Sequence, residues 1–133
     1  MKITGIHHIA IIVSDYNRSK TFYTEVLGLK ILNEVYRQER DSFKLDLAID
    51  AHYVIELFSF PAHVPRPSYP EALGLRHLAF AVDQLEKWVE KLQNSNIIVE
   101  PIRIDEFTGK KFTFFQDPDG LPLELYEDTK DFF

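Results

Sequence analysis

A short motif that contains a histidine occurs twice in this chain. Gly5–Ala10 is repeated as Gly74–Ala79, which gives His8 and His77 matching positions. A fold alone explains the repetition of a hydrophobic strand, but it does not explain a histidine at the same place in both copies. Neutral imidazole is a common metal ligand, so the repeat indicates metal chemistry.

A second repeated motif contains a glutamate. Ile55–Phe58 is echoed by Leu123–Tyr126, and its glutamates are separated by nearly the same number of residues as the two histidines. A glutamate within an apolar strand gains nothing unless it is paired, coordinated or solvated. Two histidines and two glutamates suit a divalent zinc, nickel, cobalt, iron or manganese ion. The predicted metal ligands are His8, Glu56, His77 and Glu124.

Composition limits the other functions that need to be considered. The 133 residues fit one compact domain built from two half-units, and a net charge of −6 without a Lys/Arg cluster argues against nucleic-acid binding. Cysteine is absent, which excludes disulfides and thiol chemistry from the chain itself. No stretch approaches the ~18 apolar residues of a membrane span, and no signal region is seen. We therefore expect a cytoplasmic protein.

The first half is predicted to contain a strand, a helix and three further strands. Ser14 and Asp15 are suited to begin the helix and Gly28 to end it. Asp50-Ala51 is typical of a tight hairpin turn. The predicted strands are Ile6–Val13, Lys30–Arg37, Phe43–Ile49 and His52–Phe58, and the predicted helix is Ser19–Leu27.

The second half repeats this order. Asp83 begins a helix with an apolar stripe at helical spacing, and Asp117–Gly120 is a strong turn signal. The predicted strands are Leu75–Val82, Ile97–Ile104, Lys111–Gln116 and Leu121–Tyr126, and the helical stripe is Leu85, Trp88, Val89 and Leu92.

A proline-rich segment separates the halves. Phe60–Pro70 contains four of the seven prolines, and proline is excluded from central strands. The segment is either a plain linker or, because of its aromatic and cationic residues, the wall or lid of a pocket. The single domain 1–133 is thus divided into half-modules of about 1–60 and 72–128, joined by a linker at 60–71.

The alternation of side chains along a strand predicts where the four candidates point. His8 and His77 share rows with small residues, whereas the bulkier rows belong against helices. The two glutamates lie opposite the apolar rows of their strands. All four are therefore expected on the concave sides of their sheets. His7 points the other way, and His8 is preferred as the ligand because it aligns with His77.

These motifs resemble those of the vicinal oxygen chelate superfamily, which includes glyoxalase I, methylmalonyl-CoA epimerase, extradiol dioxygenases, fosfomycin-resistance transferases and bleomycin resistance proteins. The resemblance implies an α+β fold in which two tandem βαβββ modules form a cupped mixed sheet around a metal site. It also implies a small-molecule substrate and a homodimer. The motifs that carry it are His8-Ile9-Ala10, Phe22-Tyr23 with Leu27-Gly28-Leu29, Gly74–Val82, Asp117–Gly120 and Leu123-Glu124-Leu125.

The resemblance to glyoxalase I implies a metal-dependent lyase or isomerase. The four predicted ligands fall where that enzyme has its own. There the metal holds adjacent oxygens of the substrate, and an enediolate-type intermediate forms. One ligand glutamate moves the proton between adjacent carbons, so Glu124 or Glu56 would be the base. Two positions differ from the glutathione-binding pattern of the bacterial enzyme: Ile12 replaces an arginine and Phe60 an asparagine. They favour a smaller or more apolar substrate that still chelates the metal.

Three alternatives remain from the same superfamily. An Fe(II) dioxygenase would use two histidines and one carboxylate, which leaves Glu56 surplus. The second alternative is a metal-binding protein or a ligand-sequestering protein like the bleomycin resistance members, and the ligand-sequestering members lack the metal set. A fosfomycin thiol transferase would require an extra cation-binding loop, which we do not identify in this sequence.

Overall fold

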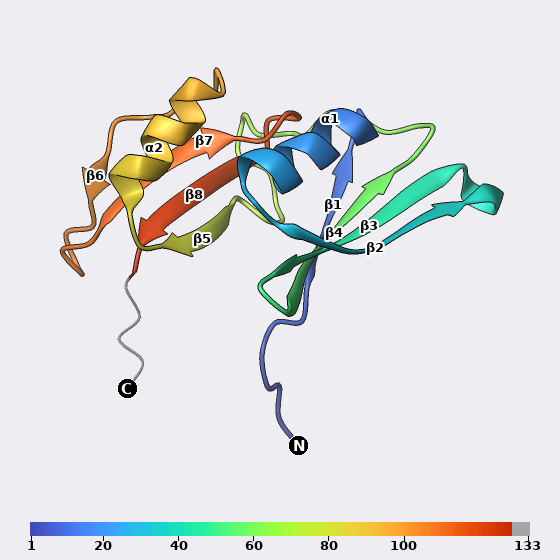
Figure 1. The fold of residues 1–133 in the computed structure, drawn as a ribbon, viewed down its shortest axis with the longest axis horizontal. Coiled ribbons are helices and arrows are strands. Elements are labelled where there is room, and N and C mark those ends of the chain that lie inside the picture. Colours follow the sequence, from blue (N-terminus) through green and yellow to red (C-terminus); the bar gives the residue numbers. More distant parts are fainter. Residues whose placement is uncertain (129–133) are drawn as a thin grey trace. The chain divides into compact units, whose positions relative to one another are not determined.

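The computed structural model describes residues 1–128 and divides into two compact units, Met1–Pro65 and a second unit that begins at Arg66. The division falls inside the predicted linker. The part of the predicted domain beyond residue 128 lies outside the described residues. Each unit contains its own four-stranded mixed sheet and a helix. Figure 1 labels the strands and helices of both units.

The first unit has the predicted order of elements. Its outer pair β1 and β4 is parallel, and the remaining pairs are antiparallel, in the order β1-β4-β3-β2. The elements are β1 (Ile9–Val13), α1 (Tyr16–Thr21), the π-helical turn η1 (Phe22–Val26), β2 (Lys30–Arg37), the 3-10 turn η2 (Gln38–Arg40), β3 (Ser42–Ile49) and β4 (His52–Ser59).

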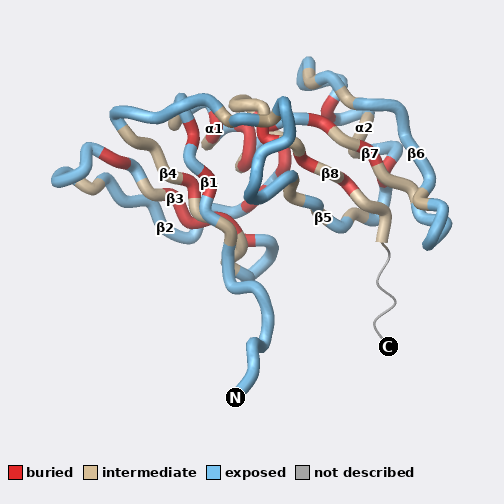
Figure 2. The backbone as a smooth tube through the Cα atoms, turned by 180° about the vertical axis from the view of Figure 1, so that it is seen from behind, coloured by how far each residue is buried: buried red, intermediate tan, exposed pale blue. Residues whose placement is uncertain are grey.

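Local sequence accounts for the helix of this unit. Asp15 caps α1, because its side chain accepts a hydrogen bond from the backbone N–H of Arg18 at 3.1 Å. Gly28 has a φ of 79°, a conformation that suits glycine after a helix. The aromatic residues Phe22 and Tyr23 are buried with the leucines of β3 and β4. The buried stretches of these strands are visible in Figure 2.

The second unit repeats the topology of the first. Its sheet order is β5-β8-β7-β6, with β5 parallel to β8. Of the predicted apolar stripe of α2, Leu85 and Leu92 are buried, and Trp88 and Val89 are half-buried. The α+β class and the tandem βαβββ arrangement are therefore confirmed. The elements are β5 (Leu78–Val82), α2 (Leu85–Asn94), β6 (Arg103–Ile104), β7 (Lys111–Gln116) and β8 (Pro122–Glu127).

Several predicted boundaries were wrong. The helix predicted at Ser19–Leu27 is instead α1 followed by η1, which together span Tyr16–Val26. The first strand of each unit is shorter than predicted, so His8 and His77 lie just before β1 and β5 rather than within them. The helix begins at Leu85 rather than Asp83. The strand predicted at Ile97–Ile104 is reduced to its last two residues, because Pro101 has no N–H for a ladder. No helix among the described residues is long and apolar enough to cross a membrane.

One buried carboxylate stabilises the turn that leads into β8. Asp117 accepts hydrogen bonds from the backbone N–H groups of Asp119 and Leu121, both at 2.9 Å. Asp117→Ala would leave these donors without that acceptor, and we expect it to lower the free energy of unfolding by about 2–3 kcal/mol. Urea denaturation checks this, with the exposed Glu106→Ala as the control. An equal effect of both variants would contradict this role.

Candidate metal half-sites

The first unit brings His8 and Glu56 together. Ala10 pairs with Glu56 across β1 and β4, and His8 precedes Ala10 by two residues, so both side chains lie on one face. His8 Nε2 is 3.6 Å from Glu56 Oε1, and the glutamate side chain is only 14% exposed. The expectation that these residues share a face is met.

Neighbouring rings orient the imidazole of His8. It stacks on Tyr53 with ring centres 5.1 Å apart, and its Nδ1 lies 2.9 Å from Nδ1 of His7. In the tautomer in which His8 Nδ1 donates to His7, Nε2 keeps a free lone pair on the side of Glu56. An imidazole whose second nitrogen is hydrogen-bonded is the usual arrangement for a metal ligand.

Glu56 is held on one side by a polar network. Its Oε2 accepts a hydrogen bond from the Tyr53 hydroxyl and lies 3.4 Å from Lys44 Nζ. Lys44 Nζ is also 2.7 Å from Asp46 Oδ1. Asp46 is the cross-strand partner of Glu56. One carboxylate oxygen of Glu56 is thus occupied, and the other faces His8.

The protonation states of this network follow from its surroundings. Burial, followed by the acceptors Glu56 and Asp46, raises the pKa of Tyr53. The hydrogen bond to Asp46 is the main reason why the pKa of Lys44 is raised. At neutral pH, Tyr53 is therefore a neutral donor and Lys44 is cationic.

The second unit contains the matching pair in a different setting. Ala79 pairs with Glu124, as Ala10 does with Glu56, and His77 Nε2 is 3.2 Å from Glu124 Oε1. The rings of His77 and Phe114 form a T-shaped pair with centres 5.0 Å apart, and Phe114 is the cross-strand partner of Glu124. Among residues 1–128, Glu124 has no hydrogen-bond donor that corresponds to Tyr53.

The distances within the pairs can be compared with those of metal ligands. Two donor atoms that bind one ion at about 2.1 Å, about 90–110° apart, lie roughly 3.0–3.4 Å from each other. The His–Glu distances of 3.6 and 3.2 Å are close to this range. Within the described part of the chain, no group of three or more His, Asp or Glu side chains is placed to hold a metal. Each unit thus brings together two of the four predicted ligands.

Several residues beside the pairs were not identified from the sequence. In the first unit they are Lys44, Asp46 and Tyr53. In the second, Arg103 lies over the rings of Phe112 and Phe114 at 5.0 and 5.6 Å. The alternation of Lys44 and Asp46 in a strand otherwise rich in leucine was an available signal for the first group. His52 and His63, which have no repeat partner, are both exposed.

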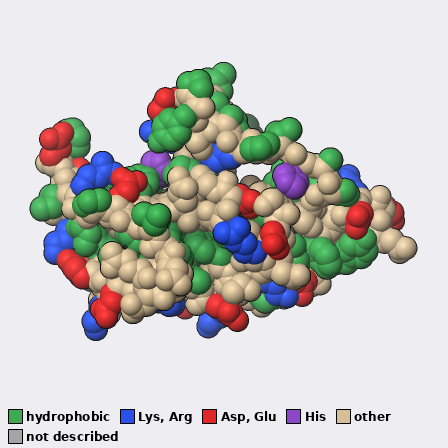
Figure 3. All heavy atoms as spheres, turned by 90° about the horizontal axis from the view of Figure 1, so that it is seen from above, with side chains coloured by type: hydrophobic (Ala, Val, Ile, Leu, Met, Phe, Trp, Pro, Cys, Tyr) green, Lys and Arg blue, Asp and Glu red, His purple; other side chains and the backbone are tan. Residues whose placement is uncertain are grey.

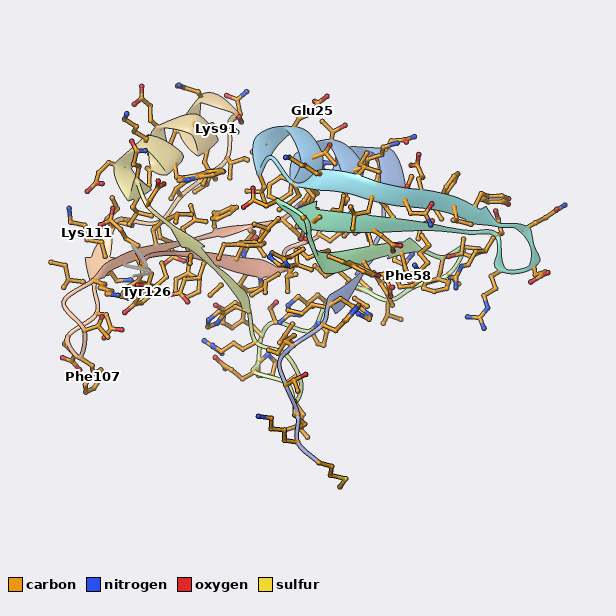
Figure 4. The ribbon with its side chains drawn as sticks, turned by 60° about the horizontal axis from the view of Figure 1, so that its bottom comes forward. Glu25, Phe58, Lys91, Phe107, Lys111 and Tyr126 are labelled. Carbon is orange, nitrogen blue, oxygen red and sulfur yellow. The ribbon has the colours of Figure 1, made fainter. Side chains whose placement is uncertain are left out.

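The two positions that differ from the glutathione-binding pattern lie in the first unit. Ile12 is 58% exposed. Phe60 stacks on Phe58 with ring centres 5.9 Å apart, and Arg37 lies over both rings. Figure 4 shows Phe58 on β4 and Tyr126 on β8, each two residues after the glutamate of its strand. An aromatic side chain therefore lies two residues after each of the two glutamates, on the same side of the strand.

A cavity of about 330 Å³ opens beside His77 within the second unit. Part of its wall is the segment 66–72, so the proline-rich region does form a pocket wall, one of the two interpretations left open by the sequence. The remaining lining residues come from the segment 76–77, from Glu100 and Arg103, from β7 and from the start of β8. Its charged lining residues are Arg66, Glu71, Arg76, Glu100 and Arg103. On the face shown in Figure 3, acidic and basic side chains are interspersed.

Comparison with known proteins gives a family and close relatives. The family model described as Glyoxalase/Bleomycin resistance protein/Dioxygenase superfamily matches residues 5–125. YwkD of Bacillus subtilis is 59% identical over 127 residues, which cover 96% of this chain and 99% of YwkD. The crystal structure of a glyoxalase family protein from Enterococcus faecalis has a TM-score of 0.87 and 51% identity, and the match covers 96% of this chain and 100% of that one.

The names of more distant relatives describe several different activities. The metallothiol transferase FosB of Staphylococcus epidermidis is 28% identical over 97% of this chain and 85% of its own. A probable chloroplastic lactoylglutathione lyase of Arabidopsis thaliana is 34% identical over 90% of this chain, which spans only 35% of that protein. A FosX mutant from Listeria monocytogenes, solved with Mn(II), shares the fold at 20% identity, a TM-score of 0.74 and coverage of 98% and 97%.

Proposed function

Because this chain belongs to the Glyoxalase/Bleomycin resistance protein/Dioxygenase superfamily, we propose that its two His–Glu pairs together bind one divalent metal ion and form the active site of a lyase or isomerase. The observation that carries the proposal is the repetition of one arrangement in both units. In each, a histidine just before the first strand approaches a glutamate on the last strand of the same sheet. The four ligands are His8, Glu56, His77 and Glu124.

The donor atoms bear on the choice of metal. Two imidazole nitrogens and two carboxylates suit zinc, nickel, cobalt, iron or manganese. The manganese in the FosX structure is consistent with this range. The two pairs come either from one chain or from two chains of a homodimer. A light-scattering mass equal to one chain would exclude the homodimer.

The two glutamates differ in what they are free to do. When bound, the metal supplies electrophilic stabilisation of charge on adjacent substrate oxygens. Glu56 has one oxygen engaged by Tyr53 and Lys44, which suits a fixed ligand. Among the described residues, the one polar side chain paired with the Glu124 carboxylate is His77. We therefore propose Glu124 as the base that takes a proton from the carbon beside a carbonyl and returns it to the adjacent carbon.

Tyr53 supports the ligand Glu56. Tyr53→Phe removes the hydroxyl that donates to Glu56 and keeps the ring that stacks on His8. We expect it to weaken metal binding by about 10–100-fold, as is usual for loss of a partner of a metal ligand. Competition with a chelating dye measures the affinity.

Tyr36→Phe is the matched control for this variant. Its hydroxyl bonds to Asp41, outside the His8–Glu56 pair, so the metal affinity of Tyr36→Phe should equal that of the wild type. An unchanged affinity of folded Tyr53→Phe would show that Tyr53 does not hold the ligand in place.

Elemental analysis followed by a substrate screen tests the proposed function. The protein should retain or take up a divalent ion and, once loaded, should isomerise the hemithioacetal of a 2-oxoaldehyde or, in the reverse direction, a 2-hydroxy thioester. Failure to bind any ion would overturn the metal site. Metal binding without turnover of either substrate class would contradict the proposed lyase or isomerase chemistry while leaving the metal site intact.

A further inference from the structure

The cavity beside His77 is lined by more cationic than anionic side chains. Three arginines and two glutamates line it, and its volume is about 330 Å³. This volume is at the lower end of ligand pockets, which are about 300–1,000 Å³. A small ligand is therefore the appropriate size. The lining residues used in the argument are Arg66, Arg76, His77, Arg103 and Phe114.

Arg66 is the arginine that is held most firmly. Its Nη2 donates to the backbone carbonyls of Leu75 and Arg76 at 2.7 and 2.8 Å, and its Nε donates to Ser68 Oγ at 3.1 Å. All three acceptors are neutral, so they orient the guanidinium without compensating its charge. In the described part of the chain, Nη1 has no partner. Arg66 thus presents an oriented cation with free donors to the cavity wall.

Arg103 brings a second cation close to the candidate metal ligand. Its guanidinium lies over the rings of Phe112 and Phe114, and the Phe114 ring also contacts the His77 ring. Stacking on aromatic rings is a common way to fix a guanidinium while its edge N–H groups remain free. Its carboxylate partner Glu100 is 3.5 Å away, and both side chains are more than half exposed. An exposed ion pair of this kind contributes little to stability, so an incoming anion can replace Glu100 as the partner of Arg103.

Arg76 also forms an exposed ion pair with a glutamate. It lies 3.4 Å from Glu71, and both side chains are more than 60% exposed. The two carboxylates of the lining thus form weak, solvated ion pairs with Arg76 and Arg103. Among residues 1–128, no carboxylate forms an ion pair with Arg66. A group with negative charge and several acceptor oxygens fits this lining better than an apolar one.

We propose that this cavity is the anion-binding subsite of the substrate. The substrate is a small molecule with a carboxylate or phosphate group, which Arg66 and Arg103 hold while its chelating oxygens lie on the side of His77. The link to catalysis rests on the function proposed above, but binding of the anion does not. This assigns a charged substrate class to a chain that lacks the usual glutathione-binding residues at Ile12 and Phe60.

The test uses metal-free protein, so that anion binding is measured apart from metal binding. Inorganic phosphate and propanoate are titrated separately at constant ionic strength, and backbone amide shifts are followed by NMR. We expect saturable shifts in segment 66–76 and around residue 103. Propanamide, which has the size of propanoate without its charge, should produce none. The tighter of the two anions identifies the group that the substrate carries.

Variants establish which residues bind the probe. Arg103→Gln and Arg66→Gln should each weaken the tighter anion by about tenfold, the usual effect of one charged hydrogen-bond partner. Arg40→Gln removes the same charge from an exposed site in the first unit and should leave the affinity within about twofold. Arg66 also forms hydrogen bonds within segment 66–76, so its substitution could change the local structure. Folded Arg103→Gln is therefore the decisive variant.

Two results would overturn the anion subsite. One is the absence of saturable shifts with either anion, and the other is equal weakening by Arg103→Gln and Arg40→Gln. If the metal-loaded enzyme is active and the metal-free protein binds neither anion, the subsite is wrong and the proposed function stands. If an anion binds in the expected way but no metal does, the subsite stands and the proposed function is wrong.

Discussion

Glu124→Gln is expected to lower proton transfer by about 10²–10⁴-fold, the usual contribution of a positioned general base. Glutamine has nearly the shape of glutamate and keeps one oxygen for a metal, but it cannot accept the proton. The measurement is the exchange of the hydrogen beside the substrate carbonyl with deuterium from D2O. Each rate is divided by the fraction of protein that carries metal, so that loss of metal is not mistaken for loss of the base.

Glu56→Gln is the matched control for this experiment. Glu56 is anchored by Tyr53 and Lys44, whereas Glu124 has no corresponding donor among the described residues. After correction for metal content, Glu56→Gln should retain a much larger share of the exchange rate than Glu124→Gln. A larger loss in Glu56→Gln would reverse the assignment of the two glutamates.

His77→Ala is expected to weaken metal binding by more than about 100-fold, because loss of a ligand should exceed the 10–100-fold effect of losing a ligand's own partner. The side chain is one third exposed, so the substitution should leave the fold intact. The affinity is measured by chelator competition, and the fold by circular dichroism.

His63→Ala provides the comparison for His77→Ala. His63 is exposed in the proline-rich segment and has no repeat partner, so its removal should leave metal affinity unchanged. Equal affinities of folded His77→Ala and the wild type would remove His77 from the metal site.

Much of the fold could be predicted because its elements follow simple periodicities. Lys30–Arg37 and Lys111–Gln116 were predicted with the bounds that the structure has. The alternation around Glu56 and Glu124 also gave their faces correctly, since the residues on either side of each glutamate are buried. The repeated motif identified the two histidines. Each lies one residue before its strand and still points to the predicted face of the sheet.

The polar network around Glu56 could not be predicted because it depends on a register shift. Near the turn, Ile49 faces His52 and Ala48 faces Tyr53. Continued regularly, this pairing would place Leu45 opposite Glu56. An irregularity between Leu47 and Ala48 places Asp46 there instead, and a bulge of this kind leaves little trace in a sequence.

The setting of His77 depends on contacts that have no local sequence signal. Arg103 reaches Phe114 from the far end of an irregular segment that had been predicted as a continuous strand. Arg66 is held by hydrogen bonds to the backbone carbonyls of Leu75 and Arg76. Any residue has such a carbonyl, so these contacts leave no signal in the sequence. The charge of the cavity therefore emerges only from the fold.

The number of metal ions per chain tests the central claim most directly. The protein is saturated with one divalent ion, freed of excess metal and analysed for metal and protein, together with His8→Ala and His77→Ala. If the two His–Glu pairs share one ion, the wild type contains one ion per chain and each variant loses nearly all of it. Two ions per chain, with each variant losing only one, would show that the pairs are separate sites and would contradict the account.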